Sequence, residues 1–249
     1  MLIDDVIQQM ENFESRNKAN LDVSDVIRDD IYCGAPSFLS GLSETSIEGL
    51  TWERTNEFRV KIVFIQEEIA RLIMIVRRLR DATKLPFIKW QNTKTLKYAE
   101  IDAEFFFHLS YSILTVLTGL TEFFYRPSPK YFVFDSFERQ RRFFIDPVFK
   151  TNKKIVDFEY RKSIDPKYSE YLMKETSWFV NFIEYRSSIT HFYPPIIAPR
   201  DYGLNFMIKN TNKEGFSSVK IPQYVNETTS KLLEFIDFYD EHFSKTFSK

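Results

Sequence analysis

The sequence has one cysteine and only six glycines in 249 residues. Cys33 has no partner for a disulfide within the chain, and no group of Cys and His residues has the spacing of a structural zinc site. We therefore expect a reducing compartment and no bound metal. The scarcity of glycine argues against a sandwich of short strands joined by glycine-rich turns.

Sequence signals of several protein classes are also missing. There is no glycine-rich phosphate loop, dinucleotide-binding turn, Gly-x-Ser-x-Gly elbow or His-Glu-x-x-His pair, so we expect no cofactor. The first ten residues contain Asp4 and Asp5 where a secretory signal has a basic end and an apolar run, which favours a cytoplasmic protein. The net charge of −1 excludes a generally basic surface, so any contact with nucleic acid must be local.

Aromatic residues are abundant. The chain contains 26 Phe and 13 Tyr, and its 43% hydrophobic and 28% charged residues are typical of a folded globular protein. Few glycines and many bulky apolar side chains favour long helices that pack on an aromatic core. We therefore predict a mainly α fold.

The N-terminal part is predicted to be an extension of the main body. Residues 2–18 show helical spacing of apolar residues, and the stretch from Arg28 to Glu53 is a connector rich in Gly, Ser and Thr. We place the boundary after this connector. Residues 1–55 are then an N-terminal helix and connector packed on the main body, and residues 56–249 form the main helical domain.

Two long helices are predicted next. Residues 56–81 carry an apolar stripe with spacings of four and three, and residues 98–125 form a second helix that opens with Glu100, Asp102 and Glu104. Within the second helix, residues 105–121 contain no charged side chain but several polar ones. This stretch is too short and too polar for a membrane span, so we expect a buried bundle helix and no membrane partner.

The second half of the chain is predicted to alternate helices and turns. Residues 131–137 alternate like a strand whereas residues 136–144 favour a short helix, and the sequence leaves both open. Asp165-Pro166 is an N-cap followed by a first-turn proline, which starts a helix that reaches Pro194. A β-hairpin is expected from the segments 204–209 and 216–221, and Asn226 is expected to cap the last helix.

The clearest functional signal is Arg186-Ser-Ser-Ile-Thr-His191, close to the predicted end of a helix. Cleavage of RNA by its own 2′-hydroxyl needs a proton acceptor, a proton donor and positive charge near the phosphate. A guanidinium matches phosphate oxygens, and an imidazole works as acid or base near neutral pH. A helix C-terminus favours the acid role for His191. Positions five apart lie about 140° around a helix, so we expect the helix to end or bend between them.

This motif, with its helical context over residues 56–246, resembles the HEPN superfamily, whose signature is an Arg, four to six residues and a His. The resemblance implies a bundle of four to five long helices and a metal-independent endoribonuclease, possessed by many toxin, toxin–antitoxin and antiphage defence systems. It implies a homodimer, and an antitoxin or regulatory protein as partner. It also implies an acidic or polar residue beside the pair, for which Glu100, Asp102 and Glu104 are candidates, and we select Glu104.

A second group of residues is predicted to bind RNA. Residues 139–162 have an excess of basic side chains, from which we select Arg141, Arg142, Lys153 and Lys154, and Ser187 joins them as the residue after Arg186. The aromatic residues between these charges are expected in the core. The alternative is a non-catalytic module of similar fold that binds nucleotide, RNA or a protein. It rests on Ser187, because family members often have Asn, Asp or His there, and on the modest overall charge. A purely structural alternative is that Arg186 pairs with a carboxylate such as Glu184 or Glu170 while His191 caps carbonyl groups.

Overall fold

Three long helices form the frame of the molecule. The structure is a computed structural model that describes residues 7–8, 38–45, 47, 50–84, 93–125, 134–151, 154–191, 196–200, 203–209 and 215–247. Within these ranges the helices are α3 (Ser40–Glu44), α4 (Trp52–Thr83), α6 (Thr93–Phe124), α7 (Phe137–Ile145), α8 (Phe158–Ile164), α9 (Pro166–Glu175), α10 (Trp178–His191) and α11 (Ile221–Phe247). The strands are β1 (Lys150–Thr151), β2 (Lys154–Ile155), β3 (Ile196–Arg200), β4 (Gly203–Lys209) and β5 (Phe216–Lys220). The prediction of a mainly α fold is confirmed.

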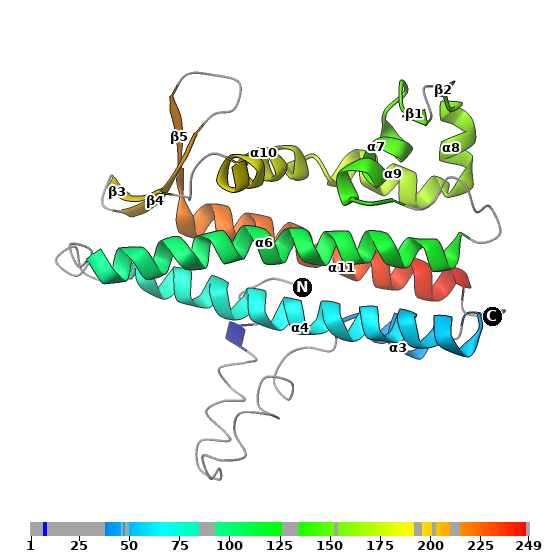
Figure 1. Ribbon diagram of the computed structural model, residues 1–249, viewed down its shortest axis with the longest axis horizontal. Coiled ribbons are helices and arrows are strands. Elements are labelled where there is room, and N and C mark those ends of the chain that lie inside the picture. The colour runs from blue at the N-terminus through cyan, green and yellow to red at the C-terminus, as the bar shows by residue number, and fades with distance from the viewer. Residues whose placement is uncertain are drawn as a thin grey trace, which may run out of the picture.

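The helices α4 and α6 lie side by side along their whole length (Figure 1). Thr51 caps α4, because its hydroxyl accepts a hydrogen bond from the amide of Arg54. The apolar stripe of α4 is buried as predicted, but α4 is longer than the predicted 56–81. The helix α6 begins at Thr93, so the expectation that Glu100, Asp102 and Glu104 open the helix is wrong. These carboxylates lie within it.

By length and composition, residues 94–124 of α6 are the one segment among the described helices that would be long and apolar enough to cross a membrane. In the structure 50% of the most apolar window of α6 is buried inside the protein. Buried helices at the centre of a bundle meet the same criteria of length and hydropathy. The packing of α6 against α4, α10 and α11 agrees with the expected bundle helix.

The helix α11 begins earlier than predicted. It starts at Ile221 with Pro222 in its first turn, so Asn226 lies inside the helix and the prediction that Asn226 caps it is wrong. Proline is tolerated there because first-turn amides have no helical partner. The short helix α3 packs on α11 through Asp240, whose carboxylate accepts hydrogen bonds from the amides of Gly41 (3.1 Å) and Leu42 (2.7 Å). The predicted helix 2–18 lies outside the described residues, except for residues 7–8.

The remaining elements form a layer on one side of α6 and α11, with α4 on the other side (Figure 1). In the segment that the sequence left open, residues 137–145 are helical, and the hairpin β1–β2 and the helix α8 follow. Asp165 caps α9 as predicted, and its carboxylate accepts from the amide of Tyr168 at 2.9 Å. The single helix expected from Asp165 to Pro194 is in fact two helices, which separate at Thr176 and Ser177.

The predicted β-hairpin before the last helix is confirmed by the antiparallel pairing of β4 and β5, in which Phe206 lies opposite Val219. A third strand, β3, pairs with β4 and was not predicted. Gly215 has a φ of 113° immediately before β5, a value that side chains other than hydrogen rarely allow. The sheet lies between α10 and α11 in the chain and contacts both helices.

Candidate functional site

Arg186 lies on α10, at the contact between α10 and α6. Its guanidinium carbon is 4.2 Å from the centre of the Tyr111 ring, and its buried Nε has no hydrogen-bond partner among the described residues. Arg186 is half-buried, yet it forms no ion pair with any carboxylate in the described part of the chain. Glu170, one of the expected partners, instead binds Lys174 at 2.6 Å. The expected Glu170 pairing is therefore wrong, and no carboxylate among the described residues compensates the charge of Arg186.

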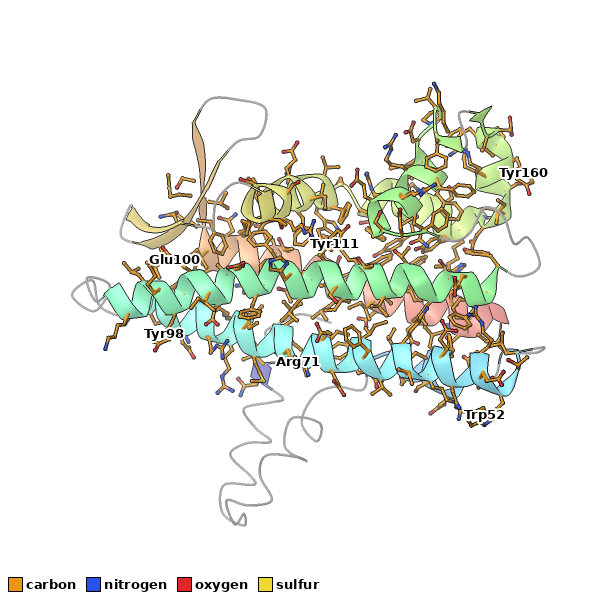
Figure 2. The ribbon with its side chains drawn as sticks, viewed as in Figure 1. Trp52, Arg71, Tyr98, Glu100, Tyr111 and Tyr160 are labelled. Carbon is orange, nitrogen blue, oxygen red and sulfur yellow. The ribbon has the colours of Figure 1, made fainter. Side chains whose placement is uncertain are left out.

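Tyr111 belongs to a stripe of residues on α6. Glu104, His108 and Tyr111 have spacings of four and three, which place them on one face of the helix. His108 Nε2 lies 3.7 Å from Glu104 Oε1, and the two side chains are 43% and 49% exposed. Figure 2 shows Tyr111 on the side of α6 that faces α10. A titratable imidazole therefore stands one turn from the ring that Arg186 covers. The sequence analysis missed His108, although its spacing from Glu104 was a usable signal.

The three acidic candidates on α6 have different surroundings. Glu100 binds Lys97 at 2.6 Å, and Asp102 binds Arg78 of α4. Glu104 is the one of the three beside a histidine. Two of the candidates therefore serve as ordinary ion-pair partners, and Glu104, the residue selected from the sequence, has the better position for chemistry at the α6/α10 contact.

The predicted partner of Arg186, His191, is the last residue of α10. The helix does not end between the two positions, and the hydroxyl of Thr190 donates to the carbonyl oxygen of Arg186 at 3.0 Å. The expected interruption is therefore absent, and positions 186 and 191 lie about 140° apart around the axis. Ser187 is half-buried beside Arg186. Within one copy, α10 does not direct positions 186 and 191 to the same side.

The predicted RNA-binding residues on α7 have protein partners. Arg141 is half-buried and donates to the Thr176 hydroxyl at 2.7 Å, and burial lowers its pKa. Arg142 is exposed and pairs with Asp146 at 3.2 Å. Lys153 lies outside the described residues, and Lys154 belongs to the strand β2. Two of the four selected basic residues, Arg141 and Arg142, are therefore already engaged by groups of the protein.

Arg161 shows most clearly that this basic stretch is partly structural. Its side chain is fully buried and donates to the backbone carbonyl oxygens of Phe143, Asp146 and Val156. It also lies 5.6 Å from the ring centres of Phe143 and Phe149. Both rings belong to the core, as expected, whereas Tyr160 of the same stretch is 50% exposed and departs from the expectation. Arg161 therefore holds α7, α8 and the turn between them together.

The described residues contain no group of three or more His, Cys, Asp or Glu side chains that could hold a metal ion. Cys33 lies outside them. The chain matches no protein-family model, no curated protein and no solved structure in the comparisons made with known proteins. The chemistry of the α6/α10 contact is accordingly the best guide to function.

Proposed function

We propose that this protein is a metal-independent endoribonuclease of HEPN type that acts on RNA at the contact between α6 and α10. The observation that carries the proposal is Arg186, a half-buried guanidinium without a carboxylate partner among the described residues. Charged groups removed from water are normally paired, so an unpaired one favours an anionic ligand. A phosphate group of RNA supplies the oxygens that a guanidinium binds best.

The chemistry divides among three kinds of group. The ribose 2′-oxygen attacks phosphorus while a base removes its proton, the bond from phosphorus to the 5′-oxygen breaks, and an acid protonates that oxygen. The products are a cyclic phosphate and a 5′-hydroxyl. Arg186 stabilises the charge on phosphorus. His191 and His108 are the candidates for acid and base, with Glu104 beside His108.

The same geometry favours a homodimer. Positions 186 and 191 lie about 140° apart around α10, so a shared cleft would use Arg186 of one copy and His191 of the other. RNA is the proposed partner, and the proposed setting is a cytoplasmic toxin or antiphage defence system in which an antitoxin or regulatory protein controls the activity.

The test uses the purified full-length chain with single-stranded RNA and a chelator. We expect cleavage that leaves a cyclic phosphate, and we expect Arg186→Ala, His191→Ala and His108→Ala each to reduce the rate by about a hundredfold or more. Arg186→Lys should be severely impaired because an ammonium lacks the planar fork. The exposed Arg59 of α4 supplies a matched control, and Arg59→Ala should cleave like the parent.

A non-catalytic module that binds RNA or nucleotide is the second candidate, and the uninterrupted helix between positions 186 and 191 favours it. The same experiment separates the two. If the folded parent binds RNA but cleaves none, the binding module is the better account. Variants that melt like the parent and still cleave at the parent's rate would contradict the assignment of the site.

A further inference from the structure

A cavity of about 620 Å³ lies between α10, β5 and α11. Its α10 wall is formed by Trp178, Asn181 and Tyr185, whose spacings of three and four place them on one face of the helix. Arg186 follows Tyr185 directly and lies about 100° further around α10. The cavity is therefore a neighbour of the Arg186 site but opens from a different face of the same helix.

Aromatic rings form much of the cavity wall and are held from behind by the core. The rings of Tyr185 and Tyr224 have centres 5.3 Å apart. Tyr224 in turn packs on Phe206 at 6.1 Å, and Trp178 packs on Phe182 at 6.0 Å. Because buried rings fix the position of the wall, a flat aromatic ligand would stack there without ordering the side chains first.

The polar groups of the cavity suit the edge of such a ligand. Asn226 lies in the α11 wall, and its buried side-chain oxygen accepts no hydrogen bond from the described residues. A buried acceptor without a donor is costly, and an N–H group of a ligand would satisfy it. Thr228 supplies a hydroxyl to the same wall. Lys231 also lines the cavity with a side chain 44% exposed, but its ammonium group pairs with Glu234 at 2.7 Å.

We propose that this cavity binds one nucleobase of an unpaired RNA strand, with its ring stacked on the aromatic wall and an N–H of its edge donated to Asn226. Each RNA base combines a flat ring with polar edge groups, which matches the aromatic rings and the unsatisfied oxygen of Asn226. The volume lies within the range of about 300 to 1,000 Å³ typical of small-ligand sites. The identification of the base as part of RNA rests on the proposed function, whereas the binding of a base does not.

The test measures binding of the four ribonucleoside monophosphates through the fluorescence of Trp178. The full-length chain carries Trp52→Phe and Trp90→Phe, so that Trp178 is the sole tryptophan. We expect at least one nucleotide to change the emission saturably, and ribose 5-phosphate, which has no base, to have no effect. Binding of ribose 5-phosphate with the same affinity, or no binding of any nucleotide, would overturn the proposal.

Three variants test whether the nucleotide binds in this cavity. Tyr185→Leu keeps an apolar wall but removes a stacking ring, and Asn226→Leu removes the acceptor; each should weaken nucleotide binding by about tenfold. Tyr160 of α8, which is 50% exposed, supplies the control, and Tyr160→Leu should bind like the parent. Equal affinities in all three folded variants would exclude this cavity as the binding site.

The outcome is separable from that of the cleavage assay. Arg186→Ala should keep its affinity for the free nucleotide, because Arg186 lies on another face of α10. If the protein binds nucleotides but never cleaves RNA, the proposed base-binding cavity is supported and the proposed ribonuclease activity is contradicted. If it cleaves RNA but binds no nucleotide, the ribonuclease activity is supported and the base-binding cavity is contradicted.

Discussion

Asp165 joins three parts of the chain through one buried carboxylate. Besides capping α9, it accepts hydrogen bonds from the hydroxyl of Tyr125 at 2.8 Å and contacts His242 Nε2 of α11 at 2.6 Å. Burial alone raises the pKa of Asp165, but the hydrogen bonds from His242, the Tyr168 amide and Tyr125 outweigh burial and leave the pKa below its ordinary value. The ionised carboxylate is therefore the form that the fold prefers.

This preference predicts how stability depends on pH. The contribution of Asp165 is complete above the unfolded pKa of about 3.9 and is lost as the pH falls through the lower folded pKa. We expect Asp165→Asn to lower the free energy of unfolding by about 3 kcal/mol at pH 7, and the difference from the parent to shrink below about pH 4. Urea denaturation from pH 7 to pH 3 measures both. Asp81→Asn, at a position with a side chain 60% exposed, should differ little from the parent, and a difference for Asp165→Asn that stays constant down to pH 3 would contradict the prediction.

At the scale of helices and strands, short sequence patterns predicted those elements whose position depends on residues close to one another in the chain. The apolar stripe predicted α4, and Asp165-Pro166 predicted the start of α9. The break between α9 and α10 was missed because Thr176 is held by Arg141 of α7, a contact over 35 residues. The start of α11 was missed because Asn226 was preferred to Pro222 as the marker of a first turn.

At the candidate site, too, the sequence predicted what is contiguous in the chain and missed what depends on contacts between helices. Arg186 was found because its motif is contiguous in sequence, and the contact with Tyr111 was not found because it joins two helices. His108 was missed for a related reason. An acidic residue and a histidine four positions apart on a helix are common. What distinguishes the Glu104–His108 pair is the packing of α10 beside Tyr111, and this contact cannot be read from the sequence.

The position of Asn226 inside α11 yields a prediction on stability. Replacing an N-cap residue costs about 1 kcal/mol, whereas removing a buried acceptor that has no donor costs nothing or stabilises. We expect Asn226→Leu to be at least as stable as the parent in thermal melting, while its nucleotide affinity falls. A melting temperature several degrees lower would show that the side chain supports the helix after all.

At the scale of the whole molecule, the exposed apolar residues of α6 indicate where a second copy would bind. Ile101 and Phe105 are 46% and 52% exposed, and they lie on either side of Glu104 in the sequence. Exposed apolar patches commonly mark interfaces, so the outer face of α6 is a suitable contact for a homodimer. His108 is three residues from both Phe105 and Tyr111 and so lies between this face and the one toward α10, which links assembly to the proposed activity.

We expect the parent to sediment at twice the 29.8 kDa mass of the chain. Phe105→Lys should sediment as a monomer and lose cleavage, because a charge in an apolar contact opposes association. Trp52, which is 77% exposed at the start of α4, provides a control, and Trp52→Lys should stay dimeric. A parent that remains monomeric at micromolar concentration would contradict the composite site.

The attachment of α3 to α11 constrains the order in which the chain folds. The bonds from Gly41 and Leu42 to Asp240 span 199 and 198 residues, and a side chain at position 41 would approach the Ser244 hydroxyl to 2.8 Å. Contacts between distant residues form late because the chain between them must be closed first. On the ribosome, α4 and α6 can pair while synthesis continues, whereas the docking site of α3 does not exist until α11 has emerged. The helix α3, which precedes α4, α6 and α11 in the chain, is therefore the last of these four to dock.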